Sequence, residues 1–218
     1  MKKGWCLMAY KKSEETRDRI VKTARRLFAE KGYERTDMKE IAGEMGMTHA
    51  ALYYYFKNKV DVAWEIYREE TECVLEEVER VQKELQSTPL FLCILQYVLI
   101  IHKLAFNPVT ESYFFDEINY RGYDRSEMMR VRKSYYGALE SLFISQGREM
   151  SDDRFTAFIL TSDAYAKALL CAIKNGTVDY SWQEALDLFF EQLILNEAGI
   201  GFGEYVRERD KVLAYLQY

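Results

Sequence analysis

The stretch of sequence that decides the fold is TDMKEIAGEMGMTHAALYYYFKNK, from Thr36 to Lys59. Its first half places apolar side chains at positions i, i+3, i+4 and i+7, which together form one face of an α-helix. Either Thr36 or Asp37 is expected to cap this helix, and Asp37 with Glu40 three residues later fits a capping box. The side chains expected to pack inward are Met38, Ile41, Ala42 and Met45.

A short joint separates this helix from a second one. Gly46 is expected to end the first helix in the left-handed conformation, and Thr48 to cap the second. Leu52 and Phe56 then lie four residues apart and point back toward the first helix. The opposite face is expected to enter the major groove of DNA, because recognition helices present their N-terminal residues to base edges. The predicted DNA-binding residues are Thr36, Thr48, His49, Ala50, Tyr53, Tyr54, Lys57 and Lys59, with the two lysines placed to contact phosphates.

Two simpler interpretations of the second helix remain open. Three consecutive tyrosines also fit an aromatic-rich core, above all Tyr55, which lies nearest the apolar face. Lys57 and Lys59, taken alone, are better explained as part of a solvated surface. The degree to which these side chains are exposed decides between the interpretations.

Residues 16 to 68 resemble the N-terminal domain of the TetR family of transcriptional regulators. The resemblance implies an all-helical homodimer, a variable ligand-binding C-terminal domain, and release of a double-stranded DNA operator when a small-molecule effector binds. A repressor on a palindromic operator is the expected function, and an activator is an open alternative. The residues that carry the resemblance are Ile20, Ala24, Leu27, Phe28, Gly32, Tyr33, Thr36, Ile41, Ala42, Gly46, Thr48, Leu52, Tyr53, Tyr55, Phe56 and Lys59.

Composition favours an all-α protein with a substantial core. The chain has 218 residues, of which 49% are hydrophobic and only two are proline. We expect an N-terminal arm at residues 1–14 and a three-helix helix-turn-helix DNA-binding domain at 15–60. A larger helical domain for effector binding and dimerisation is expected at 61–218.

Charge is distributed unevenly along the chain, whose net charge is −5. Residues 1–60 hold 14 Lys and Arg against 8 Asp and Glu, a net charge of +6. The remaining residues hold 16 against 27, a net charge of −11. This asymmetry indicates a nucleic-acid-binding end on an otherwise acidic protein.

No motif indicates a metal site, a cofactor or a membrane segment, so the protein is expected to be cytoplasmic. The four cysteines are too widely spaced for a zinc motif and too few for a disulfide scaffold. The longest apolar stretch, Leu90 to Ile101, is interrupted by Gln96 and is too short to span a membrane. An all-α enzyme is the alternative from another class, but with two histidines and no catalytic constellation we predict no catalytic residue. A helical sensor or interaction protein without repressor activity is a further alternative.

One long helix is predicted from Lys59 to about Leu85, joining the DNA-binding domain to the rest of the chain. Our hypothesis is that a tilt of this helix moves the recognition helix, because a dimer needs its two recognition helices about 34 Å apart. Beyond it, helices are expected at 89–106, from Ser126 to about Gln146, from a cap at Asp152 or Asp153, from a cap at Ser181, and at 204–216.

Aromatic residues in the C-terminal domain are candidates for an effector pocket, although aromatic side chains at helical spacing also fit an ordinary core. The candidate pocket residues are Tyr97, His102, Tyr113, Phe114 and Tyr135. Two late helices with broad apolar faces suit a four-helix dimer interface. The candidate interface residues are Phe158, Ser162, Leu169, Leu186, Phe189 and Leu193.

Overall fold

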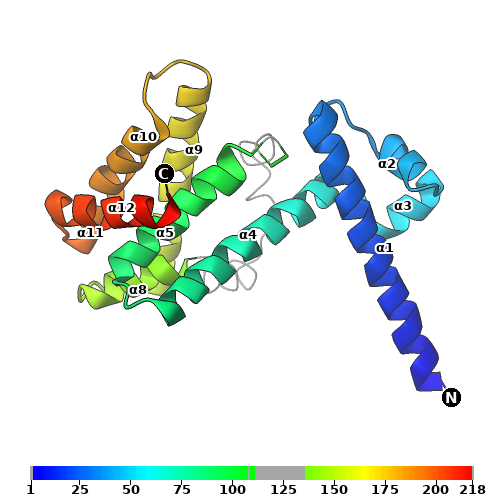
Figure 1. Ribbon diagram of the computed structural model, residues 1–218, viewed down its shortest axis with the longest axis horizontal. Helices are drawn as coiled ribbons and strands as arrows, with labels where there is room; N and C mark the ends of the chain where they lie inside the picture. The colour runs from blue at the N-terminus through cyan, green and yellow to red at the C-terminus, as the bar shows by residue number, and fades with distance from the viewer. Residues whose placement is uncertain (1, 108, 111–135, 218) are drawn as a thin grey trace. The chain divides into compact units, whose positions relative to one another are not determined.

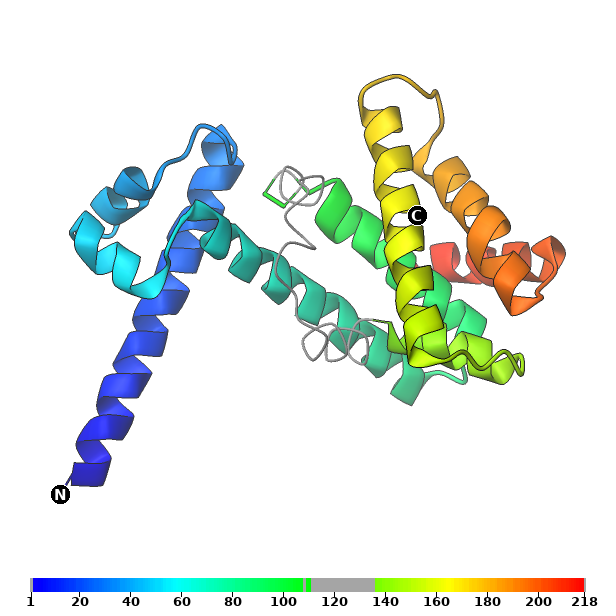
Figure 2. The ribbon, with the colours of Figure 1, turned by 180° about the vertical axis from the view of Figure 1, so that it is seen from behind.

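The computed structural model describes residues 2–107, 109–110 and 136–217, and in these residues every regular element is a helix (Figures 1 and 2). The all-α fold class is therefore confirmed. The chain divides into two compact units, the first reaching Glu70 and the second beginning at Thr71, while a short segment after Ala105 belongs with the first. The predicted domain boundaries at 14/15 and 60/61 remain predictions.

The first unit contains three helices and the beginning of a fourth. They are α1 (Lys2–Lys31), α2 (Met38–Glu44), α3 (His49–Tyr55) and α4 (Lys59–Glu84), of which α4 continues into the second unit. α1 begins at Lys2, where the sequence predicted an arm, because no proline interrupts the run and a helix already packed at its C-terminal end extends at little cost. Tyr113, Phe114 and the start of the helix predicted at Ser126 lie outside the described residues.

The core of the first unit forms where the helices bury their apolar faces together. α1 buries one apolar face, Ile41 of α2 and Leu52 of α3 are completely buried, and α4 adds Val62 and Ile66. Each such aliphatic side chain contributes about 1.5–3 kcal/mol on burial. The α1 residues on this face are Ile20, Val21, Ala24, Leu27 and Phe28.

Caps define the joint between α2 and α3 largely as predicted. Asp37 caps α2, accepting a hydrogen bond from the Glu40 amide at 2.8 Å. Thr48 caps α3 through the Ala51 amide at 3.2 Å, and Gly46 adopts a φ of +62° between the two helices. The Glu40 carboxylate pairs with Lys31.

The second unit is organised around α5, whose residues are almost all buried. α8 and α12 pack on α5, and α12 also contacts the segment that follows α10. Figure 1 shows α12, in red, beside α5. The elements of this unit after α4 are α5 (Pro89–Ile100), η1 (Ile101–Ala105), α8 (Gly137–Ser145), α9 (Asp152–Lys174), α10 (Trp182–Phe189), η3 (Phe190–Leu195), α11 (Asn196–Ala198) and α12 (Phe202–Leu216).

Several boundaries in the second unit differ from the predictions. The helix predicted at 89–106 is α-helical only to Ile100 and continues as a π-helix. Ser151 caps α9, with Asp152 and Asp153 in its first turn, because the serine hydroxyl reaches the amide of the third helical residue. Ser181 caps α10 in a complete capping box, as predicted.

α9 is unusual because it is apolar yet little buried. Within the described residues it is the helix long and apolar enough to cross a membrane by length and composition, and 17% of its most apolar window is buried within the chain. Asp163 and Lys167 lie in its middle, where charged groups are costly in a bilayer. Much of the apolar surface of this helix is therefore exposed in the described chain.

Glu65 of α4 forms a charged contact inside the first unit. Its carboxylate accepts hydrogen bonds from Arg68 at 2.8 Å and from Arg17 of α1 at 3.3 Å, and its side chain is 16% exposed. Burial alone raises the pKa of this carboxyl, but the hydrogen bonds from Arg68 and Arg17 outweigh burial. The pKa of Glu65 therefore lies below its ordinary value of 4.5.

This lowered pKa predicts a pH-dependent stability. A carboxylate with a depressed folded pKa stabilises the fold above its unfolded pKa, and that contribution is lost as pH falls through the folded value. From about pH 4.5 downward, Glu65→Gln should therefore lose less free energy of unfolding than the wild type. Urea unfolding at several pH values measures this, with Glu76→Gln, at an exposed position of the same helix, as control. Identical pH dependence in wild type and Glu65→Gln would contradict the prediction.

Candidate nucleic-acid interface

α3 separates a buried face from an exposed one. Leu52 is completely buried and Phe56, its C-cap, is 2% exposed, so this side packs into the first unit. On the opposite side Tyr53 is 43% exposed and Tyr54 82% exposed. An aromatic-core role is therefore excluded for Tyr54, whose ring is mostly in solvent, and Tyr55 is half-buried.

The exposed face of α3 combines small and aromatic side chains. Thr48 and Ala50 are exposed at its N-terminal end, so the backbone there is open to close approach. The His49 ring meets the Tyr53 ring edge-on, with centroids 4.6 Å apart. This contact restricts how Tyr53 projects from the helix and leaves its hydroxyl at the surface as a hydrogen-bonding group. The major groove of B-DNA is wide enough to admit an α-helix of this kind.

Arg17 of α1 holds the C-terminal end of α3 in place. Its guanidinium donates to the Tyr55 carbonyl at 3.0 Å, which satisfies a carbonyl that the end of the helix leaves unpaired. The same group lies 4.2 Å from the centroid of the Phe56 ring. This positioning role depends on a tertiary contact, which the sequence pattern alone does not indicate.

Two residues of the predicted DNA-binding set have structural contacts instead. Thr36 is 1% exposed, and its hydroxyl donates to the carbonyls of Gly32 at 3.0 Å and Leu27 at 3.4 Å. The Lys59 ammonium donates to the Tyr33 carbonyl at 2.8 Å and lies 4.0 Å from the centroid of the Tyr33 ring. Thr36 is therefore withdrawn from the DNA-facing set, and Lys59 fastens the start of α4 to the turn after α1.

Positive charge remains on the surface of the first unit. Lys57, just beyond α3, is exposed, and its backbone amide donates to Asp61 at 3.0 Å. Arg25 and Arg26 of α1 are paired with carboxylates and contribute less to the outward field. Exposed basic residues of this unit include Arg19, Lys22, Arg35, Lys39 and Lys57.

The predicted effector residues are only partly described. Tyr97 of α5 contacts the rings of Phe189 and Phe190 at centroid distances of 4.9 and 5.5 Å. His102 of η1 meets Trp182 edge-on at 4.5 Å, and burial lowers the pKa of its imidazole, which is therefore neutral at pH 7. Tyr113, Phe114 and Tyr135 lie outside the described residues.

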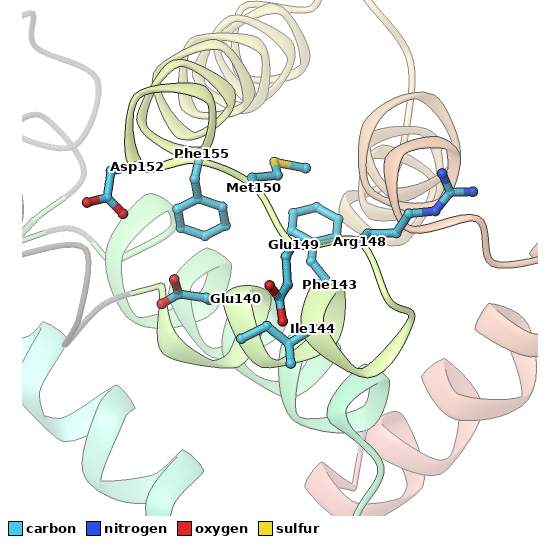
Figure 3. A pocket seen from close by; sticks show the side chains of 8 residues that line it. All are labelled: Glu140, Phe143, Ile144, Arg148, Glu149, Met150, Asp152 and Phe155. Atoms are coloured by element: carbon cyan, nitrogen blue, oxygen red, sulfur yellow. The ribbon is translucent and has the colours of Figure 1, made fainter.

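A shallow hollow of about 190 Å³ lies elsewhere in the second unit, between the end of α8 and the start of α9 (Figure 3). Of the predicted pocket residues that the structure describes, neither Tyr97 nor His102 lines it. Its aromatic side chains, Phe143 and Phe155, are buried in the core. The lining residues are Glu140, Phe143, Ile144, Arg148, Glu149, Met150, Asp152 and Phe155. Among the residues described, no group of three or more His, Cys, Asp or Glu side chains is placed to hold a metal ion.

The predicted dimer-interface residues divide into two groups. Ser162, Leu186 and Phe189 are buried within one chain, where the Ser162 hydroxyl donates to the Phe158 carbonyl at 2.7 Å. These three residues therefore belong to the protomer core. The prediction missed this because sequence periodicity does not show which side of an apolar helix packs against its own chain. Phe158, Leu169 and Leu193 are half-buried.

The contacts of Lys59 predict a measurable loss of stability. Lys59→Met should lower the free energy of unfolding by about 1 kcal/mol, because it removes a charged donor from the Tyr33 carbonyl. Lys57→Met, at an exposed position, is the matched control and should change stability by less than about 0.5 kcal/mol. Chemical denaturation followed by circular dichroism compares them, and equal stability of the two variants would refute the structural role of Lys59.

Comparison with known proteins identifies the first unit. The family described as "Bacterial regulatory proteins, tetR family" matches residues 20–66. The uncharacterized HTH-type transcriptional regulator YerO of Bacillus subtilis is 49% identical over 45 residues, which are 21% of this chain and 16% of YerO. The HTH-type transcriptional regulator AcrR of Shigella flexneri is 42% identical over 55 residues, 25% of this chain and 26% of AcrR. The matched segments thus span about a quarter or less of these relatives.

A solved structure extends the likeness of the fold to most of the chain. RolR, in complex with the ligand resorcinol, superposes with a TM-score of 0.66 and covers 91% of this chain and 95% of its own. Its sequence identity is 17%, so this likeness concerns the fold. The curated relatives are named as transcriptional regulators, not as enzymes. Residues 20–66 are therefore similar to the N-terminal domain of the TetR family of bacterial regulatory proteins.

Proposed function

We propose that this protein is a transcriptional regulator that binds a palindromic DNA operator as a homodimer and releases it when a small-molecule effector binds. The observation that carries the proposal is the exposed face of α3, with Tyr53 and Tyr54 in solvent and Leu52 buried behind them. The match of residues 20–66 to DNA-binding regulators supports it. Repression is proposed as the sign of regulation, and the cytoplasm as the location.

In the proposed complex, α3 lies in the major groove. Thr48, His49 and Ala50 approach base edges, with the Ala50 methyl suited to a thymine methyl group. Tyr53 and Tyr54 offer hydroxyls to bases or phosphates, and Lys57 contacts the DNA backbone. Arg17 acts by holding the end of α3 at a fixed angle.

A homodimer is supported by the exposed apolar face of α9. Leu160 is 38% exposed, and alanines 157, 164 and 168 are exposed on the same side of the helix. Small side chains allow two helices to pack closely, and a twofold axis through such a pair matches a palindromic operator. We therefore propose this face as the dimer contact. At about 100° per residue, the half-buried Phe158 and Leu169 lie on the other side of α9, and Leu193 lies on η3, so these three residues are not assigned to this face.

The proposed effector is a small aromatic molecule bound in the second unit. Tyr97 and His102 lie among the aromatic rings of α10 and η3, and the imidazole of His102 is held neutral by burial. A neutral imidazole both donates and accepts a hydrogen bond, which suits a hydroxyl on such a ligand. The resorcinol bound by RolR is a small aromatic molecule of this kind.

Tyr53→Ala directly tests whether the exposed face of α3 contacts DNA. The change should weaken specific binding by about 1–3 kcal/mol, because it removes a groove-facing contact. Tyr180→Ala is the matched control, since Tyr180 in the second unit is also 43% exposed. Fluorescence-anisotropy titrations of labelled operator duplex measure both. Equal affinity of Tyr53→Ala and wild type, with the fold intact by circular dichroism, would remove Tyr53 from the interface.

Leu160→Glu tests the proposed dimer contact. A carboxylate at this position would be buried without a partner in the interface, so the dimer should dissociate to monomers. Ile144→Glu replaces an apolar residue that is 54% exposed on α8 and should leave the dimer intact. Sedimentation-velocity analysis at micromolar concentration distinguishes the two states. A fully dimeric Leu160→Glu variant would place the interface on another surface.

A further inference from the structure

The last turn of α12 is bound to α4 by a closed network of hydrogen bonds. The Tyr215 hydroxyl donates to Glu77 Oε1 at 2.9 Å and accepts from Arg80 Nη2 at 2.6 Å. Arg80 also binds Glu77 through two nitrogens, at 2.6 and 3.0 Å. The three side chains therefore hold one another in fixed geometry, and α12 restrains the second half of α4.

The middle of α12 is attached to the beginning of α5. Glu208 is 9% exposed, and its carboxylate accepts a hydrogen bond from the Thr88 hydroxyl at 2.9 Å. Thr88 is the N-cap of α5, and the same hydroxyl accepts from the Phe91 amide at 3.1 Å. The linker between α4 and α5 is thus tied to α12 as well.

The first half of α12 is anchored in the aromatic cluster of α5, α10 and η3. Tyr205 is completely buried, and its ring stacks on Phe190 with centroids 4.9 Å apart and planes at 21°. Its hydroxyl donates to Asp187 Oδ1 at 2.7 Å, and Arg209 pairs with the other oxygen of Asp187. Phe190 in turn contacts Tyr97, the residue that we place at the effector site.

We propose that α12 is a strut that transmits displacement of this aromatic cluster to α4. Tyr205 and Tyr215 lie on one uninterrupted helix, about 15 Å apart along its axis at 1.5 Å per residue. A helix of this length moves as a unit, so a ligand that shifts Phe190 also shifts the Tyr215 contact with Glu77 and Arg80. Because α4 is one helix from Lys59 to Glu84, the shift reaches the DNA-binding unit. The ligand near Phe190 and the effect on the DNA-binding unit rest on the proposed function, whereas the mechanical link from Tyr205 to α4 does not.

Hydrogen exchange of the full-length protein tests the strut without an effector. Tyr215→Phe removes the hydroxyl and keeps the ring, so amides of residues 74–84 should exchange roughly two- to tenfold faster. Tyr205→Phe, at the other end of α12, should accelerate exchange in the same segment of α4. Tyr180→Phe, at an exposed position outside this network, is the control and should leave that segment unchanged.

The strut is overturned if Tyr205→Phe accelerates exchange in α10 and α12 while residues 74–84 exchange at the wild-type rate. Should Tyr205→Phe fail to fold, Arg209→Gln releases the same carboxylate of Asp187 and takes its place. DNA titration separates the two proposals. A wild-type protein that binds no DNA contradicts the regulator function while the exchange result still decides the strut. A protein that binds DNA, with wild-type exchange in Tyr205→Phe, contradicts the strut alone.

Discussion

Burial of Leu52 and Phe56 is the constraint on which the rest of the first unit depends. Because one side of the two-turn helix α3 is buried in the core, its other side faces solvent. Tyr53 and Tyr54 lie on that exposed side. Arg17 completes the arrangement by lying against the Phe56 ring and satisfying the end of α3. Hydrophobic packing thus sets the orientation of α3, and the polar groups of Tyr53 and Tyr54 lie on its exposed side.

The distribution of charge and the packing of the helices both divide the chain into an N-terminal and a C-terminal part. The basic N-terminal region holds a small helical unit suited to a polyanion, whereas the acidic remainder builds a larger core around α5. α4 belongs to both units, since Val62 and Ile66 are buried in the first, and Val74 and Val81 in the second. One continuous helix with buried apolar residues in each unit is the route by which the proposed ligand binding would be coupled to the proposed DNA binding.

Local patterns predicted the fold well because caps and helix faces depend on residues close in sequence. Asp37, Thr48 and Ser181 cap the helices as expected, and the predicted apolar face of α3 is buried. Contacts between residues far apart in the sequence could not be predicted from these local patterns. The ammonium of Lys59 is bound by a carbonyl 26 positions earlier, which no periodicity indicates.

The same limit explains the outcome for the second unit. The sequence of an apolar helix indicates that the helix is buried, but it does not indicate which surface the helix packs against. Ser162, Leu186 and Phe189 were therefore assigned to an interface, although they are buried within one chain. Thr36 was predicted to bind DNA, yet its side chain is buried and its hydroxyl donates to the Gly32 carbonyl. In both cases the prediction failed because the residues that surround a side chain are determined by the tertiary structure, not by the local sequence.

The central claim, sequence-specific recognition of DNA by a dimer, is tested most directly by titrating the wild-type protein into fluorescently labelled DNA from upstream of its own coding sequence. A scrambled duplex of equal length is titrated in parallel, at low and at high salt. The account predicts tighter binding to the upstream duplex, two protomers per site and a preference that persists as salt rises, because base contacts depend less on salt than phosphate contacts do. Absence of binding to either duplex at low salt would contradict it.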